Sequence, residues 1–316
     1  MTFKDILRMR LVAQRLAGEG KAVSPAEVVA GFGAMQSQDY GMSKWAVGLR
    51  IGGSHEEVEE AIERGEILRT HVLRPTWHLV AAADIRWMLE LTAPQIRTKM
   101  AFREKYLELD KKILARCRRL VGAALAKKPQ MPRTELVALF KKAGIATDDN
   151  RSSHILVDAE LEGLICSGPG KGTYALLDER APSARRLSRE EALAELTRRY
   201  FSGHGPATLN DFSWWSGLLV KDVKKGVASL GAELRSVKLK EKEYWLVDGK
   251  EGARMPSALL LPAFDEWIIG YADRAGLFAT EHERKIITVN GLFRPVMVCN
   301  GLATGSWRPV EKRERL

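Results

Sequence analysis

The chain has 316 residues, of which 45% are hydrophobic, so it can bury a sizeable core and divide into two or three domains. Its formal charge of +10 favours a polyanionic partner, nucleic acid before an anionic membrane, although a basic surface without a partner is the simpler alternative. Three isolated cysteines, Cys117, Cys166 and Cys299, exclude a disulfide framework and a structural zinc site. The sequence lacks a signal peptide and a membrane-spanning apolar run, which predicts a soluble, cytoplasmic protein with no membrane partner.

Residues 1–95 are expected to fold into helices followed by strands. The N-cap Ser24, the first-turn Pro25 and the capping-box Glu27 mark the start of one of these helices. Hydrophobic periodicity predicts helices over 3–16, 25–35, 39–49 and 54–64 and an extended stretch over 67–80. Short helices followed by strands are the order of a winged-helix unit.

The same order is expected twice more along the chain. Long basic helices over 97–128 lead into the second round, whose hairpin has the glycine-rich, lysine-bearing tip Gly168 to Gly172, typical of a wing. The other expected elements are helices over 133–143, 151–164, 189–201, 208–215 and 221–230, with strand pairs over 165–177 and 234–247. We therefore predict a mainly α fold with β wings (α+β), built from three tandem winged-helix units over 1–95, 96–181 and 182–254.

A small β-rich C-terminal module is expected over 255–316. Its short β-prone runs cover 259–262, 285–289 and 295–299. Asn300-Gly301 then favours a hairpin that leads into 302–308.

Two glutamines, Gln36 and Gln38, lie one residue apart at the end of an apolar, helix-like run. Each neutral amide offers two donors and an acceptor, so the pair can hold a polar ligand. Spacing alone favours the simpler interpretation that these are solvated or capping side chains. The neighbouring Asp39 is expected to be the N-cap of the next helix, or else a carboxylate that assists catalysis.

Basic residues mark several candidate contacts with phosphate. Arg69, His71 and Arg74 interleave with apolar residues in a strand-like stretch, where a cation near a phosphate gains a charge-assisted contact. The alternative is that His71 and the nearby His78 are structural, hydrogen-bonded core residues. The remaining candidates are Arg151, Ser152 and His154 at the start of an expected recognition-like helix, and Lys171 in the second wing; for the helix start, a solvated helix end is the alternative.

Several short motifs follow one another along nearly the whole chain. They are Met35-Gln36-Ser37-Gln38-Asp39, Leu73-Arg74-Pro75-Thr76-Trp77-His78-Leu79-Val80, Gly205-Pro206-Ala207-Thr208, Trp214-Trp215-Ser216-Gly217, Leu261-Pro262-Ala263-Phe264-Asp265, Gly270-Tyr271-Ala272-Asp273-Arg274 and Gly305-Ser306-Trp307-Arg308. Each is weak alone, but in this order they resemble the AlkZ-like DNA glycosylases. The family is often described only as winged-helix DNA-binding proteins.

The resemblance implies a fold of three tandem winged helices with a C-terminal β-module. It implies a metal-independent, monofunctional DNA glycosylase without a cofactor, which excises alkylated purines, including bulky adducts and interstrand crosslinks, from double-stranded DNA. The family's Gln-aliphatic-Gln signature falls on Gln36 and Gln38, which are then the catalytic residues. Arg274 and Arg308 in the later motifs join the expected DNA contacts, and we expect a monomer.

This chemistry suits glutamine. An N7- or N3-alkylated purine is cationic and leaves without being protonated, so the enzyme has to position a water and stabilise an oxocarbenium-like transition state. Two features depart from the family pattern: Ser37 replaces an aliphatic residue, and the chain stops soon after Arg308, which is expected to weaken the β-module. The alternatives are a non-catalytic winged-helix DNA binder, such as a regulator, and a relative that has lost activity.

Overall fold

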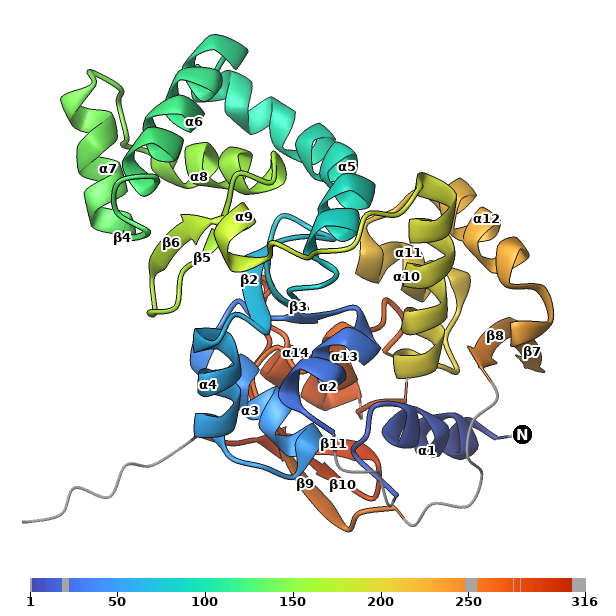
Figure 1. Ribbon diagram of the computed structural model, residues 1–316. Coiled ribbons are helices and arrows are strands. Elements are labelled where there is room, and N and C mark those ends of the chain that lie inside the picture. The colour runs from blue at the N-terminus through green and yellow to red at the C-terminus, as the bar shows by residue number, and fades with distance from the viewer. Residues whose placement is uncertain (1, 19–22, 248–254, 275, 279, 309–316) are drawn as a thin grey trace, which may run out of the picture.

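The computed structural model describes residues 2–18, 23–247, 255–274, 276–278 and 280–308 (Figure 1). Over these residues the chain has a mixed α/β fold with small antiparallel sheets. The first helix, α1 (Phe3–Ala13), starts at a capping box formed by Thr2 and Asp5 and buries Ile6 and Leu11.

The first unit places a three-stranded sheet against three helices. Its elements are α2 (Pro25–Phe32), β1 (Ala34–Gln36), α3 (Tyr40–Ile51), α4 (His55–Glu63), β2 (Ile67–His71) and β3 (Trp77–Ala81). The strand order is β1-β3-β2, so the hairpin strand β3 lies in the centre. Apolar residues at helical spacing, including Val29, Phe32 and Ile62, form the core beneath the sheet.

The second unit repeats this order after a long helix, α5 (Ile85–Tyr106). Its elements are α6 (Lys111–Leu125), β4 (Gln130–Pro132), α7 (Arg133–Lys142), α8 (Arg151–Leu161), β5 (Ile165–Ser167), β6 (Thr173–Leu176) and α9 (Leu177–Arg180). The strand order is β4-β6-β5, the same arrangement as in the first unit. It has its own core, which includes Leu136, Phe140 and Ile155.

The third unit has a hairpin but only a trace of the first strand. It contains α10 (Arg189–His204), α11 (Leu209–Ser216), α12 (Val220–Leu230), η1 (Gly231–Glu233), β7 (Leu234–Leu239) and β8 (Lys242–Val247). A single antiparallel bridge between Ala207 and Trp245 occupies the place of the missing strand.

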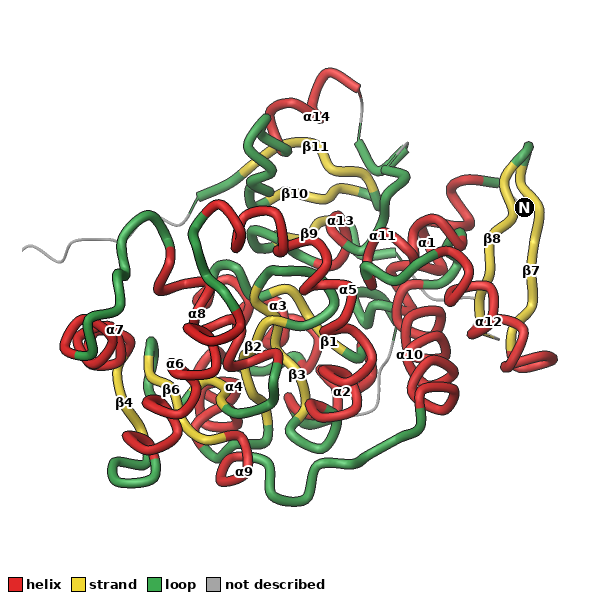
Figure 2. The backbone as a smooth tube through the Cα atoms, turned by 90° about the horizontal axis from the view of Figure 1, so that it is seen from above, coloured by secondary structure: helices red, strands yellow, loops and turns green. Residues whose placement is uncertain are grey.

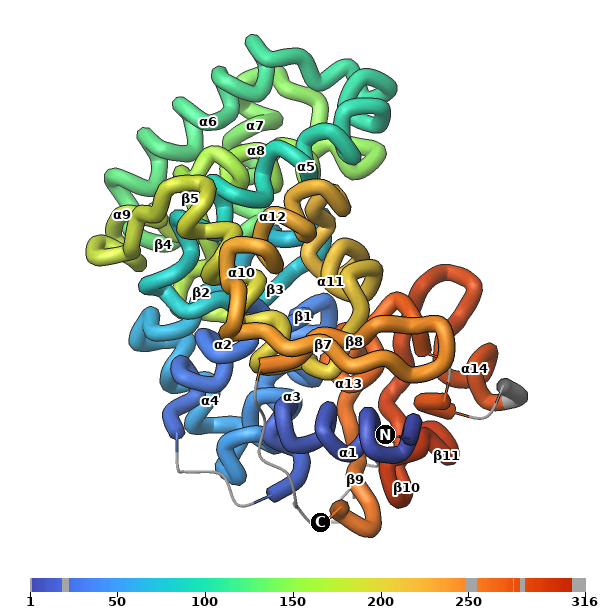
Figure 3. Tube along the Cα trace, turned by 90° about the vertical axis from the view of Figure 1, so that its right-hand side faces the viewer, coloured from blue at the N-terminus to red at the C-terminus, as the bar shows by residue number. Residues whose placement is uncertain are grey.

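The C-terminal module is a small sheet with two short helices. It contains β9 (Ala258–Leu261), α13 (Glu266–Ile269), α14 (Thr280–Ile286), β10 (Val296–Cys299) and β11 (Leu302–Ser306), with strand order β11-β10-β9. The second unit extends away from the rest of the molecule along α5 (Figures 1 and 3), whereas β7 and β8 form a hairpin at the opposite edge (Figure 2).

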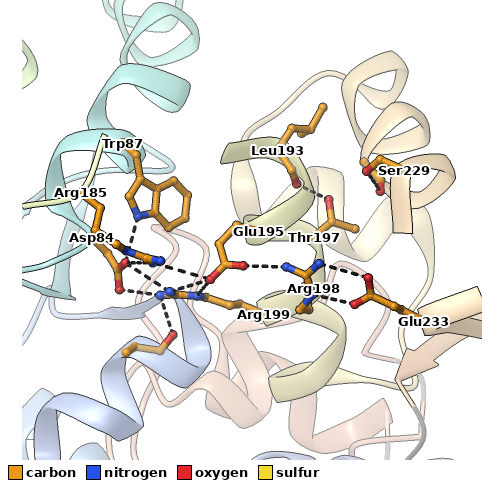
Figure 4. A network of polar contacts seen from close by, with 12 residues as sticks. Asp84, Trp87, Arg185, Leu193, Glu195, Thr197, Arg198, Arg199, Ser229 and Glu233 are labelled. Atoms are coloured by element: carbon orange, nitrogen blue, oxygen red, sulfur yellow. Dashed lines mark hydrogen bonds and ion pairs between the residues drawn. The ribbon is translucent and has the colours of Figure 1, made fainter. Parts of the chain in front are cut away.

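A buried carboxylate joins the first unit to α5 and α10. Asp84, just before α5, accepts hydrogen bonds from Arg199 of α10, from Arg185 and from the Trp87 indole (Figure 4). Arg199 also donates to the carbonyl oxygen of Ala30 in α2 at 2.9 Å. The network therefore fixes the first and third units to each other beside the strand that carries Gln36.

Most expected elements are found, with two corrections. The helix expected over 25–35 ends at Phe32, because Gly33 adopts φ +81°, and residues 34–36 form strand β1 instead. The long basic helices expected over 97–128 are α5 and α6, which are separated where Glu108 has φ 52°. The strand expected over 285–289 is wrong, since α14 continues to Ile286.

Candidate active site

Gln36 lies on the edge strand of the first sheet. It is opposite His78 in the antiparallel ladder, and directly opposed residues extend their side chains to the same face of a sheet. The Gln36 side chain is 5% exposed, and its Oε1 accepts a hydrogen bond from Thr76 Oγ1 at 3.3 Å. Gln38 follows the strand and is exposed. The structure therefore presents one fixed glutamine and one accessible glutamine.

The backbone of Gln36 is held by a buried carboxylate from the C-terminal module. Glu266 Oε1 accepts from the Gln36 N–H at 2.8 Å, and Oε2 accepts from Trp215 Nε1 and His204 Nε2, both at 3.0 Å. Burial tends to raise the pKa of Glu266, but the interactions with His204, Gln36 and Trp215 outweigh it and lower the pKa. An ionised carboxylate thus lies at the open edge of the strand at neutral pH.

A second buried contact places Glu266. Arg50 of α3 forms a bidentate ion pair with Asp265, with both N–O distances 2.9 Å and both side chains at most 1% exposed. Asp265 also caps α13 by accepting from the Trp267 N–H. Because Glu266 is the first residue of α13, this ion pair fixes its carboxylate against β1.

Ser37, the departure from the family pattern, is buried with polar partners. Its hydroxyl lies 2.8 Å from Ser43 Oγ, and Arg69 donates to both its carbonyl and its hydroxyl oxygen. Arg69 also lies over the Trp77 ring, 4.2 Å from its centroid. A hydroxyl is therefore accommodated where the family has an aliphatic side chain, and Arg69 supports the turn between Gln36 and Gln38.

The two histidines of the first hairpin are buried and hydrogen-bonded. His78 Nδ1 lies 2.8 Å from the Thr76 carbonyl and donates to it, while burial lowers the pKa of His78 to about 3, so the ring is neutral. His71 Nδ1 lies 2.9 Å from Glu160 Oε2 and packs against Trp77. Both agree with the structural alternative considered for them.

The connection between β2 and β3 turns into the molecule. Val72 and Leu73 are fully buried, and the Arg74 guanidinium lies over the Trp214 ring of α11, 4.4 Å from its centroid. Arg274 lies over the same ring at 4.7 Å. Burial is the main cause that lowers the pKa of Arg74 to about 10; the negative charge of Glu266 opposes this shift, and the positive charge of Arg274 adds to it.

Asp39 is the N-cap of α3, as preferred from the sequence. Its Oδ1 accepts from the Met42 N–H at 3.0 Å, and the residue is exposed. Capping satisfies a first-turn donor of the helix that follows the glutamines. An assisting role in catalysis stays a prediction.

The remaining predicted contacts are spread over the molecule. Arg151 donates to the carbonyl oxygens of Leu107 and Ala146, and the Ser152 hydroxyl accepts from Arg133. The other three are His154, whose Nδ1 is 3.9 Å from Glu104 Oε1, Lys171, exposed in the β5–β6 turn, and Arg308, exposed after β11. The structure therefore brings Arg74 and Arg274 together on Trp214, but it does not bring these five to the same place.

Sequence reasoning missed the groups that surround Gln36. Glu266, His204 and Trp215 come from segments far along the chain and meet the strand only in the folded protein. Trp214, Trp215 and the Asp265 segment are part of the motifs quoted above, so their order was a usable signal. The order of the motifs did not show that these residues would surround Gln36 together.

The chain is basic, its Gln36 is fixed on a strand, and two arginines stack on Trp214. These features are typical of proteins that act on nucleic acid. Residues 29–316 match the family described as DNA glycosylase AlkZ-like, and the chain therefore belongs to that family. It is a monofunctional DNA glycosylase, as the resemblance implied, and the alternative of a non-catalytic regulator is not favoured.

The similar proteins agree with this assignment. The interstrand DNA cross-link repair glycosylase of Streptomyces sahachiroi is 24% identical over 315 residues, which cover 92% of this chain and 83% of that protein. The solved structure of Streptomyces sahachiroi DNA glycosylase AlkZ superposes with a TM-score of 0.81 at 20% identity, over all of this chain and 92% of the other. The two share a fold.

Within the described residues, no helix is long and apolar enough to cross a membrane.

Proposed function

We propose that the protein hydrolyses the N-glycosidic bond of cationic N7- or N3-alkylated purines in double-stranded DNA, and that bulky adducts and interstrand crosslinks are among its substrates. The observation that carries this proposal is the buried amide of Gln36, held by Thr76 and by the main-chain contact to Glu266. The cross-link repair activity named for the relative from Streptomyces sahachiroi supports the crosslink part.

In the proposed reaction, the glutamines position the water rather than deprotonate it strongly. We propose that the buried amide of Gln36, at the end of the strand, and the exposed amide of Gln38, just after it, hold one water between them. Water oxygen bonds to the sugar anomeric carbon, the C–N bond breaks, and the base leaves with that electron pair as a neutral purine. The water gives up its proton to solvent.

The negative charge of Glu266 at the open edge of the strand favours the same step. The positive charge passes from the alkylated base to the sugar in the transition state, where a fixed negative group lowers its energy. Glu266 is ionised and buried one hydrogen bond from the Gln36 backbone. A base that is uncharged in the substrate would have to be protonated or leave as an anion, and the proposed reaction supplies no acid for it, which restricts the enzyme to labile, cationic lesions.

We also propose that the three helix–helix–hairpin units are winged helices, bounded at 1–95, 96–181 and 182–254 before the module at 255–316, and that the protein acts as a monomer. The boundary at 95 divides the continuous helix α5, which then belongs to both units. Exposed Lys171 and Arg308 are proposed to contact the DNA backbone directly. Since Arg69, His71, Arg151, Ser152 and His154 have neighbours inside the protein, we propose that they position the surface that DNA meets.

The test is an excision assay on duplex DNA. Purified protein should release 7-methylguanine from alkylated DNA, and the double variant Gln36→Ala, Gln38→Ala should lose about 100-fold or more in rate while keeping salt-sensitive binding. The single variant Asp39→Asn, which keeps a capping side chain, separates an assisting carboxylate from a helix cap. Measurable release of uracil or hypoxanthine would contradict the restriction to cationic bases. Tight binding of an undamaged sequence with no excision would overturn the proposal.

A further inference from the structure

Two arginines from distant segments meet on one tryptophan next to the proposed catalytic strand. Arg74 comes from the β2–β3 connection, Trp214 from α11, and Arg274 from the segment after α13. Both guanidinium groups lie within 5 Å of the same ring centroid. The positive charge of Arg274 acts to lower the pKa of Arg74, so holding the two like charges in this region costs free energy.

The approach of these segments depends on Gly217. This residue ends α11 with φ +72°, and a Cβ there would lie 2.5 Å from the Leu73 carbonyl oxygen and 3.5 Å from Arg74 Cγ. Any other residue would push the β2–β3 connection away from α11. The Arg74–Trp214 contact is therefore built into the backbone.

Neither arginine forms an ion pair with a carboxylate among the described residues, and the negative charges that act on them, Glu266 on Arg74 and Glu283 on Arg274, are not hydrogen-bonded to them. Arg50 and Arg199, by comparison, are paired with Asp265 and Asp84. Nε and Nη2 of Arg74 and Nη2 of Arg274 are buried without a hydrogen-bond partner among the described residues. Arg274 Nε donates to the neutral carbonyl oxygen of Ile268. Buried charged donors without partners are costly, and an anion would satisfy them.

The chemistry of the pair selects an oxyanion with several acceptor oxygens. Guanidinium groups bind phosphate through paired N–H donors, and stacking on an indole fixes their planes without using those donors. Burial, the main cause, lowers the pKa of Arg74 to about 10, and the nearby charge of Arg274 adds to the shift, so a bound anion would also restore the ordinary pKa of the side chain.

The pair lies beside Gln36. Thr76, two residues after Arg74, donates to Gln36 Oε1. The positive charge of Arg74 also contributes to the lowered pKa of His78, which is opposite Gln36 in the ladder. Nucleotides within a DNA strand are flanked by phosphates, so a lesion held at Gln36 would bring phosphates of its own strand into the same region.

We propose that Arg74, Trp214 and Arg274 form a phosphate clamp that holds one phosphodiester of the DNA strand carrying the alkylated purine and so sets the sugar against Gln36. This inference rests on the proposed function and deepens it, because the clamp would act on the same strand of the same substrate. It gives Arg74 and Arg274 a single joint role, distinct from general attraction by the basic surface.

The test removes phosphate charges one at a time. Duplexes with a single 7-alkylguanine and one neutral methylphosphonate at successive positions are compared for single-turnover excision. In parallel, their binding is measured with the Gln36→Ala, Gln38→Ala protein. At one position, the methylphosphonate should lower the excision rate of wild type about 10-fold to 100-fold. On the duplex with all its phosphates, Arg74→Gln or Arg274→Gln should lower the excision rate about as much. In these variants the methylphosphonate at that position should lower the rate no further.

The controls separate a clamp from structural support and from bulk charge. Arg186→Gln removes an exposed arginine that pairs with Glu90 and should leave excision and the methylphosphonate profile unchanged. Arg74→Gln should keep or raise the melting temperature, since it removes an unpaired buried charge, whereas a structural role predicts a lower one. Added inorganic phosphate tests whether the site takes the free ion, in which case millimolar phosphate should inhibit wild type more than Arg74→Gln.

If a methylphosphonate lowered excision and binding by a similar amount at every position, and if its effect added to that of Arg74→Gln, the clamp would be overturned, even when wild type excises normally. Loss of excision by wild type on every alkylated duplex would instead contradict the proposed function. In that case, a position-specific binding loss that vanishes in Arg74→Gln would still support the clamp. Inhibition by free phosphate without any position-specific loss would identify a site for the free ion and exclude the DNA clamp.

Discussion

The sheets of the first and second units have the same strand order but opposite surroundings. In the first, the open edge is occupied by Glu266 and the hairpin tip is buried, with Val72 and Leu73 fully enclosed. In the second, the edge residue Gln130 is exposed, and so is the tip residue Lys171. One order of elements thus yields a closed sheet that holds the candidate site and an open sheet whose tip can meet a partner.

The composition of the two tips accounts for this difference. The first tip begins with Val72 and Leu73, which gain free energy by leaving water, and Pro75 limits the conformations of the turn. The second tip consists of glycines, a proline and Lys171, which have little apolar surface to bury. The difference in burial therefore follows from a few side chains rather than from the topology.

The largest effect is expected where the closed sheet meets the C-terminal module. Asp265→Ala leaves Arg50 buried without its carboxylate, and such a change costs about 3–5 kcal/mol of unfolding free energy. Denaturant unfolding of both proteins measures it. Excision per folded molecule should also fall, because Glu266 loses its placement. A change below about 1 kcal/mol would show that the pair does not hold the module.

The second expected effect contrasts the two tips directly. Leu73→Ala removes a fully buried side chain and should lower the unfolding free energy by about 2–5 kcal/mol. Lys171→Ala at the exposed tip should change it by less than about 0.5 kcal/mol. Equal losses from the two substitutions, measured by urea unfolding under one condition, would remove the distinction between closed and open sheets.

A smaller effect concerns the pH dependence of the closed sheet. The pKa of His78 is about 3 in the folded protein, below the ordinary value of 6.5, so only the unfolded chain takes up this proton between those values. Stability should fall as the pH drops from 7 to 5, and His78 should contribute about 2 kcal/mol of that loss.

The His78→Gln variant should lack this contribution, while keeping whatever the other titrating groups add. Glu266, whose pKa is lowered, acts in a separate window, since its stabilising effect is lost only as the pH falls below its ordinary value of 4.5. Unfolding curves at pH 7, 6 and 5 separate the two. If the unfolding free energies of wild type and His78→Gln fell by the same amount between pH 7 and pH 5, His78 would be accessible to protons in the folded protein.

The smallest expected effect is on binding by the open sheet. Lys171→Ala should weaken binding to any duplex about equally and reduce the dependence of log K on log salt concentration by about 0.9. Titrations at several salt concentrations, with Arg186→Gln as a matched exposed control, measure this. An unchanged slope would place the second tip away from the DNA.

Local sequence signals predicted most of the fold, since capping boxes and hydrophobic periodicity mark elements within a few residues. The capping box at Ser24 lies where expected, as does the Asn300-Gly301 hairpin. The short strand β1 was missed because three residues carry no periodicity, and only Gly33 signals that the preceding helix has ended. The β-prone run over 285–289 begins inside α14, where local propensity gave way to tertiary context.

The candidate site was predicted less completely, for a related reason. The resemblance marked Gln36 and Gln38, and position in the chain marked Asp39 as a cap. The contact between Gln36 and Glu266 is set by long-range packing, which no local pattern encodes, so Glu266 emerged as its partner only with the fold. Several arginines expected on DNA proved to have internal partners, because a charge in the sequence does not say whether the fold supplies its counter-group.

The hydrogen bond between Gln36 and Glu266 joins positions 230 residues apart in the chain. During synthesis at about 5–20 residues per second, the strand would emerge roughly 10–50 s before the carboxylate that holds it. Until then the ribosome-bound chain has a sheet with an open edge and no fixed glutamine. The strand therefore reaches its final arrangement only after Glu266 has been synthesised, and a chain that stops before this residue would lack the fixed glutamine.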